Sequence, residues 1–209
     1  MQREILIEAR LLQLDAGAAP ELPGDALHAL YVAEGQLAAL GAGEAAFVDA
    51  AACLQAVEPS LLWLFSVSRG RLTAGADTGV FSAMVKLPEG AETLVRLDRI
   101  ELPPGTVTPR HRHRGPGIRA VLSGSVDAMV GPRRFPVATG EAWLETPGDD
   151  IIGRADATLG TGFVRLMLLP ADLVGGATSF VAVPPRPDDP PSPVFERRQT
   201  ILLERLSRL

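Results

Sequence analysis

The sequence predicts an all-β protein made of two copies of one barrel-type unit and a proline-rich C-terminal segment. Two observations support this prediction. The 209-residue chain has 21 glycines and 18 prolines scattered between short apolar runs, which is typical of many short strands joined by turns. Four blocks of its first half also recur, in the same order, in its second half. Such an internal repeat indicates a duplicated structural unit.

Short segments of apolar and polar residues indicate the individual strands. Clear examples are residues 94–102, 118–122, 134–137 and 162–169. Several of them alternate apolar with polar residues, as half-buried strands do. The alanine-rich stretch 42–56 could suggest a helix, but the repeat favours strand and turn. Residues 200–209 have leucines at roughly helical spacing, so we expect a short terminal helix there.

The repeat defines the expected domain organisation. The matched blocks are residues 7–17 with 95–105, 30–37 with 119–126, 43–49 with 140–146, and 61–67 with 163–169. Gly35 matches Gly124 within the second pair of blocks. We therefore expect one unit over residues 1–78 and a second over 79–183, joined by a connection near residues 69–79.

Residues 184–209 form the third expected region. Residues 184–193 read PPRPDDPPSP. Repeated prolines lack N–H donors and exclude both a helix and an inner strand. The sequence therefore predicts an extended strap here, followed by an apolar C-terminal segment that needs a partner surface. Together with exposed barrel edges, this segment leads us to expect a homodimer.

Composition excludes several classes of protein. A net charge of −5 argues against a general nucleic-acid binder, which needs a basic face. The single cysteine, Cys53, cannot form an internal disulfide, and the charged start MQREILIEAR lacks the apolar core of a signal peptide. The most apolar stretch, residues 61–67, is far shorter than the about 20 residues of a membrane span. We expect a cytoplasmic protein without membrane or nucleic-acid partners.

The second copy contains a histidine motif framed by glycines. Its first part runs from Gly105 through His111-Arg112-His113 to Gly117 and Gly124, and its second from Gly140 through Thr146-Pro147-Gly148 to Ile151 and Ala155. These spacings resemble the two motifs of the cupin family. The resemblance implies a bicupin, with two tandem cupin barrels of the double-stranded β-helix or jelly-roll type. The second copy is most similar to a cupin-2 conserved barrel domain.

The metal motif that the resemblance implies is incomplete. His111 and His113 match two ligands of the family, but Gly117 stands in the place of its glutamate and Ile151 in the place of its third histidine. In the first copy, Leu22 and Gly24 fall near the histidine positions. We therefore expect the first barrel to be degenerate and structural.

Three residues are candidates for a metal site in the second copy. Two histidines two apart on a strand face the same way, so His111 and His113 can share a ligand, with Arg110, Arg112 and Arg114 facing solvent. Glu145 can complete a 2-His-1-carboxylate set for iron, manganese, nickel or zinc. His111 and Glu145 are also the candidate catalytic residues, with Glu145 as ligand or general base. Alternatively, Glu145 faces water or pairs with an arginine, and no metal is bound.

Anion recognition is the other chemistry that the sequence suggests. Arg119 lies two residues beyond Gly117, and Arg165 lies inside an apolar strand. The planar guanidinium suits a carboxylate or phosphate. The alternative for both arginines is that they face outward or pair with Glu145. Trp143 and Phe163 are candidates for the pocket wall or for plain core.

Two functions follow from these residues. The first is a small-molecule cupin enzyme of oxygenase or isomerase type, acting with a divalent metal on an anionic metabolite. The second is a metal-free module that binds or senses a small molecule without catalysis. A structural remnant with no ligand is a third interpretation, because a fold alone does not determine a reaction.

Overall fold

The computed structural model describes residues 1–22, 25–48, 54–70, 79–192 and 198–209. Cys53 and most of the expected connection, residues 71–78, lie outside this part of the chain. The described residues are mainly β-strand, with a single 3-10 turn named η2 (Ala171–Leu173), so the all-β prediction is confirmed. Among them, no helix has the length and apolar character of a membrane span. Backbone contacts divide the chain into two units, Met1–Ala91 with Arg208–Leu209, and Glu92–Ser207.

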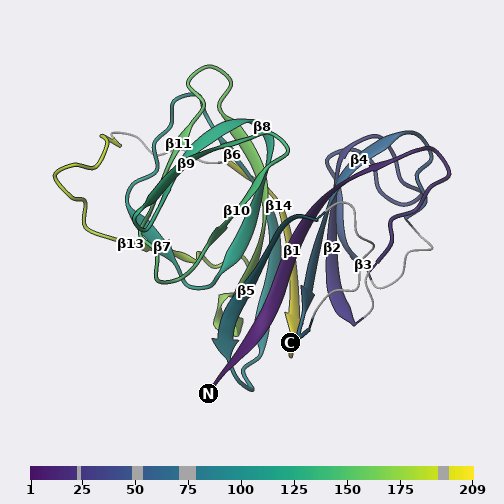
Figure 1. Cartoon of the computed structure of the whole chain (residues 1–209), viewed down its shortest axis with the longest axis horizontal. Coiled ribbons are helices and arrows are strands. Elements are labelled where there is room, and N and C mark those ends of the chain that lie inside the picture. Colours follow the sequence, from purple (N-terminus) through teal and green to yellow (C-terminus); the bar gives the residue numbers. More distant parts are fainter. Residues whose placement is uncertain (23–24, 49–53, 71–78, 193–197) are drawn as a thin grey trace. The chain divides into compact units, whose positions relative to one another are not determined.

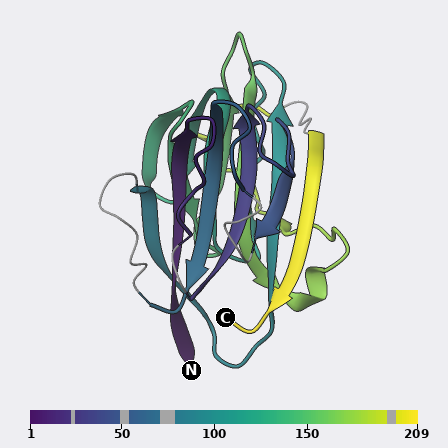
Figure 2. The ribbon, with the colours of Figure 1, turned by 90° about the vertical axis from the view of Figure 1, so that its right-hand side faces the viewer.

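The first unit is a five-stranded antiparallel sheet with the order β3-β2-β4-β1-β5, seen face-on in Figure 2. Its strands are β1 (Gln2–Leu14), β2 (Ala26–Glu34), β3 (Ala45–Val48), β4 (Ser60–Ser68) and β5 (Gly79–Pro88). β3 lies in the alanine-rich stretch where the repeat favoured strand over helix. β5 begins where the sequence placed the second unit, but it pairs with β1. The structural division therefore falls between residues 91 and 92.

The second unit has nine strands that curl around an interior (Figure 1). They are β6 (Thr93–Leu102), β7 (His111–His113), β8 (Gly117–Val130), β9 (Arg133–Ala138), β10 (Ala142–Glu145), β11 (Ile151–Ala155), β12 (Thr161–Pro170), β13 (Phe180–Ala182) and β14 (Arg198–Ser207). The first half of β8 pairs with β10 and β12, and its second half pairs with β9 and β11. One long strand therefore serves two sheets, as in a jelly-roll.

Gly124 lies where β8 changes partners. Its φ is 69°, a conformation that favours glycine, and a Cβ there would lie 2.0 Å from the carbonyl oxygen of Gly160. The glycine that matches the family motif is therefore required by backbone geometry. The core of the second unit takes side chains from both sheets, namely Ile100, Leu102, Val121, Val126, Ala128, Val130, Val137, Trp143, Ala155 and Phe163.

The strand pairing shows the internal repeat directly. The order β3-β2-β4-β1-β5 in the first unit corresponds to β10-β8-β12-β6-β14 in the second. Equivalent cross-strand rows are Leu12–Leu62–Val32 and Ile100–Phe163–Val121. The sequence repeat aligns Leu61 with Phe163, whereas the strand pairing aligns Leu62 with Phe163. The alignments differ by one residue because the register shifts at Val32/Glu34 and Gly162/Phe163 cannot be seen in the sequence. That the first unit is itself a cupin barrel stays a prediction.

The C-terminal region differs in part from the expectation. The expected helix over residues 200–209 is wrong, because residues 198–207 form strand β14, which pairs antiparallel with β6. Pairing with an existing strand satisfies the backbone and overrides a helical spacing of leucines. The described residues 183–192, between β13 and the gap at 193–197, contain neither strand nor helix, as the prolines predict.

Candidate functional site

Strand β7 carries the two histidines on one face. His111 and His113 are 6% and 4% exposed, whereas the side chain of Arg112 between them is 46% exposed. The alternation of the strand thus directs both rings inward and the arginine outward. β7 is held in place on one side by β11 and on the other by β13.

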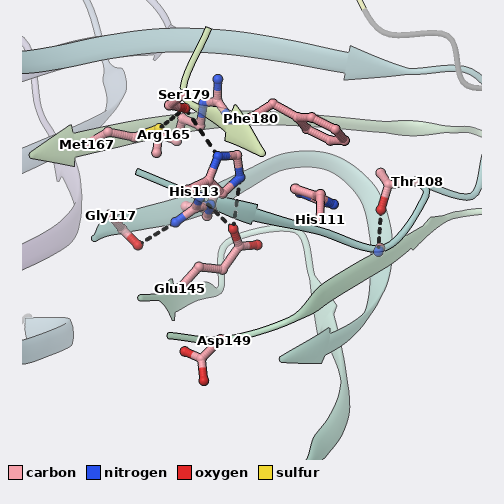
Figure 3. Close-up of polar contacts among 12 residues, drawn as sticks. Thr108, His111, His113, Gly117, Glu145, Asp149, Arg165, Met167, Ser179 and Phe180 are labelled. Atoms are coloured by element: carbon pink, nitrogen blue, oxygen red, sulfur yellow. Dashed lines mark hydrogen bonds and ion pairs between the residues drawn. The ribbon is translucent and has the colours of Figure 1, made fainter. Parts of the chain in front are cut away.

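Each histidine is oriented through its Nδ1 atom. His111 Nδ1 lies 2.8 Å from the carbonyl oxygen of Pro109, which can only accept a hydrogen bond. His113 Nδ1 lies 3.1 Å from Ser179 Oγ, and the Ser179 hydroxyl donates to Met167 Sδ at 3.8 Å (Figure 3). The contact with the Pro109 carbonyl requires a proton on His111 Nδ1, which leaves the lone pair of His111 Nε2 free. This is the arrangement of a histidine prepared to ligate a metal.

Glu145 ends strand β10 directly opposite Gly117 on β8. Its Oε1 accepts a hydrogen bond from Trp143 Nε1 at 2.9 Å, and its Oε2 lies 3.4 Å from His113 Nε2. Ligand atoms of His111, His113 and Glu145 all lie within 4.8 Å of one another. A carboxylate from the neighbouring strand thus lies beside the two histidines, although the family's glutamate position holds Gly117.

Both candidate arginines are buried and already paired. Arg119 is 1% exposed; its Nη2 lies 2.5 Å from Glu145 Oε2, and its Nη1 donates to the carbonyl oxygen of Gly117 at 2.6 Å. Arg165 is 6% exposed and binds Asp98 through two contacts, Nε–Oδ1 at 2.5 Å and Nη2–Oδ2 at 3.0 Å. Neither arginine faces outward, and the partner of Arg165 is Asp98 rather than Glu145.

Burial and charge determine the protonation states at the site. Burial lowers the pKa of His113 to about 4 and also lowers the pKa of His111. Burial by itself raises the pKa of Glu145, but Arg119 and His113 hold that pKa far below its ordinary value. The pKa of Arg119 falls to about 10 through burial. At neutral pH the histidines are neutral, while Glu145 and Arg119 are charged.

A cavity of ≈ 50 Å³ lies between these groups. Its wall includes all the candidate residues of the sequence, His111, His113, Arg119, Trp143, Glu145, Phe163 and Arg165. Trp143 and Phe163 meet edge to face, with ring centroids 5.6 Å apart. A larger hollow of ≈ 430 Å³ elsewhere in the second unit, lined by residues such as Glu101, Ser123 and Arg198, contains none of the three metal-ligating candidates.

Four residues of the site have no signal in the sequence. Phe180 stacks on His111, with centroids 4.5 Å apart and ring planes at 12°, and Thr108 also lines the cavity. Ser179 orients His113, and Asp98 neutralises Arg165. Ser179 and Phe180 follow a loop without periodicity. Asp98 lies opposite Arg165 only because β6 pairs with β12. A search for acids on strands neighbouring Arg165 could have suggested Asp98.

The three arginines around the histidines differ from the expectation at one position. The side chains of Arg112 and Arg114 are 46% and 40% exposed, but that of Arg110 is only 4% exposed. Arg110 pairs with Asp189 and with Asp150. The proline-rich segment brings Asp189 to this place, which the spacing of the arginines could not predict.

Comparisons with known proteins agree with the observed fold. Residues 98–150 match the family described as "Cupin domain". AerE from Microcystis aeruginosa has a similar structure, with a TM-score of 0.52, 11% identity, and coverage of 78% of this chain and 88% of AerE. Salicylate 1,2-dioxygenase from Pseudaminobacter salicylatoxidans is similar at a TM-score of 0.50 and 11% identity, covering 77% and 70% of the two chains. No curated protein matches the sequence. Residues 98–150 of the second unit thus match a cupin domain, and the fold of the chain is similar to those of AerE and salicylate 1,2-dioxygenase.

Proposed function

We propose that the cupin domain binds one divalent transition metal through His111, His113 and Glu145 and presents it to a small organic anion. One observation carries this proposal: the three donors lie within 4.8 Å of one another, and both histidines are oriented through Nδ1. Two neutral imidazoles and one carboxylate fit iron, manganese, nickel or zinc. The residues present therefore fit the metal that cupin domains imply.

The residues around the metal-ligating candidates suggest how a reaction would be supported. A bound metal would supply Lewis acidity or oxygen activation. Glu145 serves as ligand or as general base, while Trp143 and Phe163 exclude water beside it. Arg119 provides a positive charge for the carboxylate of a ligand. An oxygenase or isomerase acting on a small acidic metabolite is the activity that these groups support best.

The metal content of the protein tests this proposal. The full chain, purified without a histidine tag and incubated with each metal in turn, should retain close to one metal ion per chain. The double variant His111→Ala, His113→Ala should lose it. His28→Gln is the matched control, because His28 is buried in the first unit beside Ser66 Oγ at 2.9 Å and should leave the metal content unchanged. Absence of metal from the wild-type protein would refute the proposal.

Metal-free binding of a small molecule is a second candidate function. It is favoured by the 2.5 Å contact of Arg119 with Glu145, since the Arg119 guanidinium already neutralises the carboxylate that a metal ion would need. In this case His111, His113, Arg119 and Arg165 bind the ligand through hydrogen bonds and charge alone. A carboxylate would then raise the melting temperature of metal-free protein, and Arg119→Ala would abolish the rise. No change of melting temperature with any carboxylate would exclude this function.

A further inference from the structure

Glu145 Oε2 is the oxygen atom on which metal binding would depend. Its other oxygen, Oε1, is held by Trp143, so Oε2 is the one that faces His113 Nε2, at 3.4 Å. The same Oε2 lies 2.5 Å from the Arg119 guanidinium. A metal ion and Arg119 would therefore compete for one oxygen atom, because both are positively charged.

The charges of the described pocket residues already balance. Arg119 is paired with Glu145 and Arg165 with Asp98. A ligand carboxylate entering this pocket would find no unpaired cation among these residues. It would also have to approach Glu145, which carries the same charge.

Loss of the ion pair between Glu145 and Arg119 would change this balance of charges in the pocket. Arg119 is 1% exposed and cannot turn to water, and Arg165 lies directly opposite it on the neighbouring strand. A buried guanidinium without an acid is strongly unfavourable. Arg119 would then need a new anion, whereas Arg165 would keep its two contacts with Asp98.

We propose that a divalent metal and a small carboxylate bind cooperatively. The metal binds Glu145 and breaks its ion pair with Arg119, and the carboxylate of the ligand then pairs with Arg119 in place of Glu145. This inference rests on the proposed function and deepens it by naming the ligand class. The cavity of ≈ 50 Å³ favours a short aliphatic carboxylate. By thermodynamic linkage, the carboxylate must tighten metal binding by the same factor as the metal tightens carboxylate binding.

Titration of the full chain with Co²⁺ tests the coupling. Calorimetry and the visible absorption of Co²⁺ give the affinity in acetate and in its neutral isostere acetamide. We expect acetate, but not acetamide, to tighten Co²⁺ binding about tenfold, within the usual range of coupling between two sites. Free acetate also complexes Co²⁺ in solution, which would weaken the apparent affinity, so the direction of the effect is diagnostic.

Two substitutions of Arg119 complete the test. Arg119→Met removes the competing charge and should bind Co²⁺ more tightly than wild type, with no further effect of acetate. Arg119→Lys keeps the charge and should retain the wild-type affinity and the acetate effect. If Arg119→Met does not fold, the wild-type comparison of acetate with acetamide and the lysine variant still decide the question.

The outcomes separate this inference from the proposed function. Equal Co²⁺ affinity in acetate and acetamide would overturn the coupling while leaving the metal site intact. The same conclusion would follow if Arg119→Lys bound Co²⁺ as tightly as Arg119→Met. Absence of Co²⁺ binding by wild type and by Arg119→Met would instead overturn the metal site, and the coupling with it.

Discussion

Ser179 supports His113 from outside the cavity. Its hydroxyl contacts His113 Nδ1 at 3.1 Å, and Ser179 is only 3% exposed. Loss of such a partner of a metal-ligating histidine weakens metal affinity about 10- to 100-fold. We predict this loss for Ser179→Ala in a Co²⁺ titration, whereas Ser179→Thr, which keeps the hydroxyl, should remain closer to wild type. Equal affinities in all three proteins would show that Ser179 has no role in positioning the ring.

Gly117 shows why the glutamate of the family motif cannot simply be restored. A Cβ at this position would lie 2.6 Å from the carbonyl oxygen of Leu166 and 2.9 Å from Met167 Cγ. We predict that Gly117→Ala lowers the free energy of unfolding by about 1–3 kcal/mol, the usual cost of overpacking, and that Gly117→Glu lowers it further.

Urea unfolding measures the effect of these substitutions. Gly153→Ala is the matched control, because the nearest atom to a Cβ there is Val126 Cγ2 at 3.5 Å, an ordinary contact. Equal stability of Gly117→Ala and Gly153→Ala would contradict the prediction.

The two histidines predict a pH dependence of the metal-free protein. Their pKa values are lowered by burial, that of His113 from 6.5 to about 4, so below pH 6.5 the unfolded state binds more protons than the folded state. Stability is therefore fully present above about pH 6.5 and falls as the pH falls toward about 4. Each histidine adds a slope of about 1.4 kcal/mol per pH unit within its window.

Unfolding free energies between pH 7 and pH 4 check this dependence. The double variant His111→Gln, His113→Gln should show a shallower decline than wild type over this range. Parallel curves would mean that the two rings titrate normally in the folded protein.

At the scale of elements, the proline-rich segment anchors the outer wall of the site. Asp189 pairs with the buried Arg110, and Ser192 Oγ donates to the carbonyl oxygen of Val107 at 2.6 Å. The same segment follows β13, which pairs with the histidine strand β7 and carries Phe180. The contacts of Asp189 thus help to hold β13 against the histidines.

We predict that Asp189→Asn loosens this segment. Hydrogen–deuterium exchange of peptides over residues 178–192 should be faster than in wild type, because the ionic contact of Asp189 with Arg110 is lost. Asp188→Asn is the matched control, since Asp188 is its exposed neighbour. If both variants exchange at the same rate, the Arg110–Asp189 pair does not anchor the segment.

Elements also show where sequence patterns succeed and fail. The histidine strand, the glycine that interrupts β8 and the alternation of the candidate residues follow from spacing, because a strand places every second side chain on one face. The terminal segment 198–207 was expected to be partly helical, but its strand conformation depends on pairing with β6, more than 90 positions earlier in the chain. Local spacing contains no information about such a partner.

At the scale of the whole molecule, the repeat predicts one metal site per chain. Cross-strand pairing places Leu30, Leu64 and Val48 of the first unit at the positions of Arg119, Arg165 and Glu145. His28, the counterpart of Gly117, bonds to Ser66. The first unit therefore has apolar residues where the second has its charged groups.

We also expect the chain to form a homodimer, which would protect its open strand edges. The edge strand β14 exposes Leu206 to 43% and the edge strand β13 exposes Val181 to 43%. Light scattering coupled to size exclusion should give twice the 22.1 kDa of one chain. A mass of 22.1 kDa at micromolar concentration would contradict this expectation.

The sequence by itself determined the all-β class, the repeat, the two inward histidines and most of the charged and aromatic residues that line the cavity, namely Arg119, Trp143, Glu145, Phe163 and Arg165. These features depend on periodicity and turn chemistry, which act over a few residues. Only the tertiary structure decided the rest: that Glu145 lies beside the two histidines, that it forms an ion pair with Arg119, and that Asp98, Ser179 and Phe180 complete the site. Each of these contacts joins segments that are separated in the chain, and the register between strands is set by packing of the whole domain.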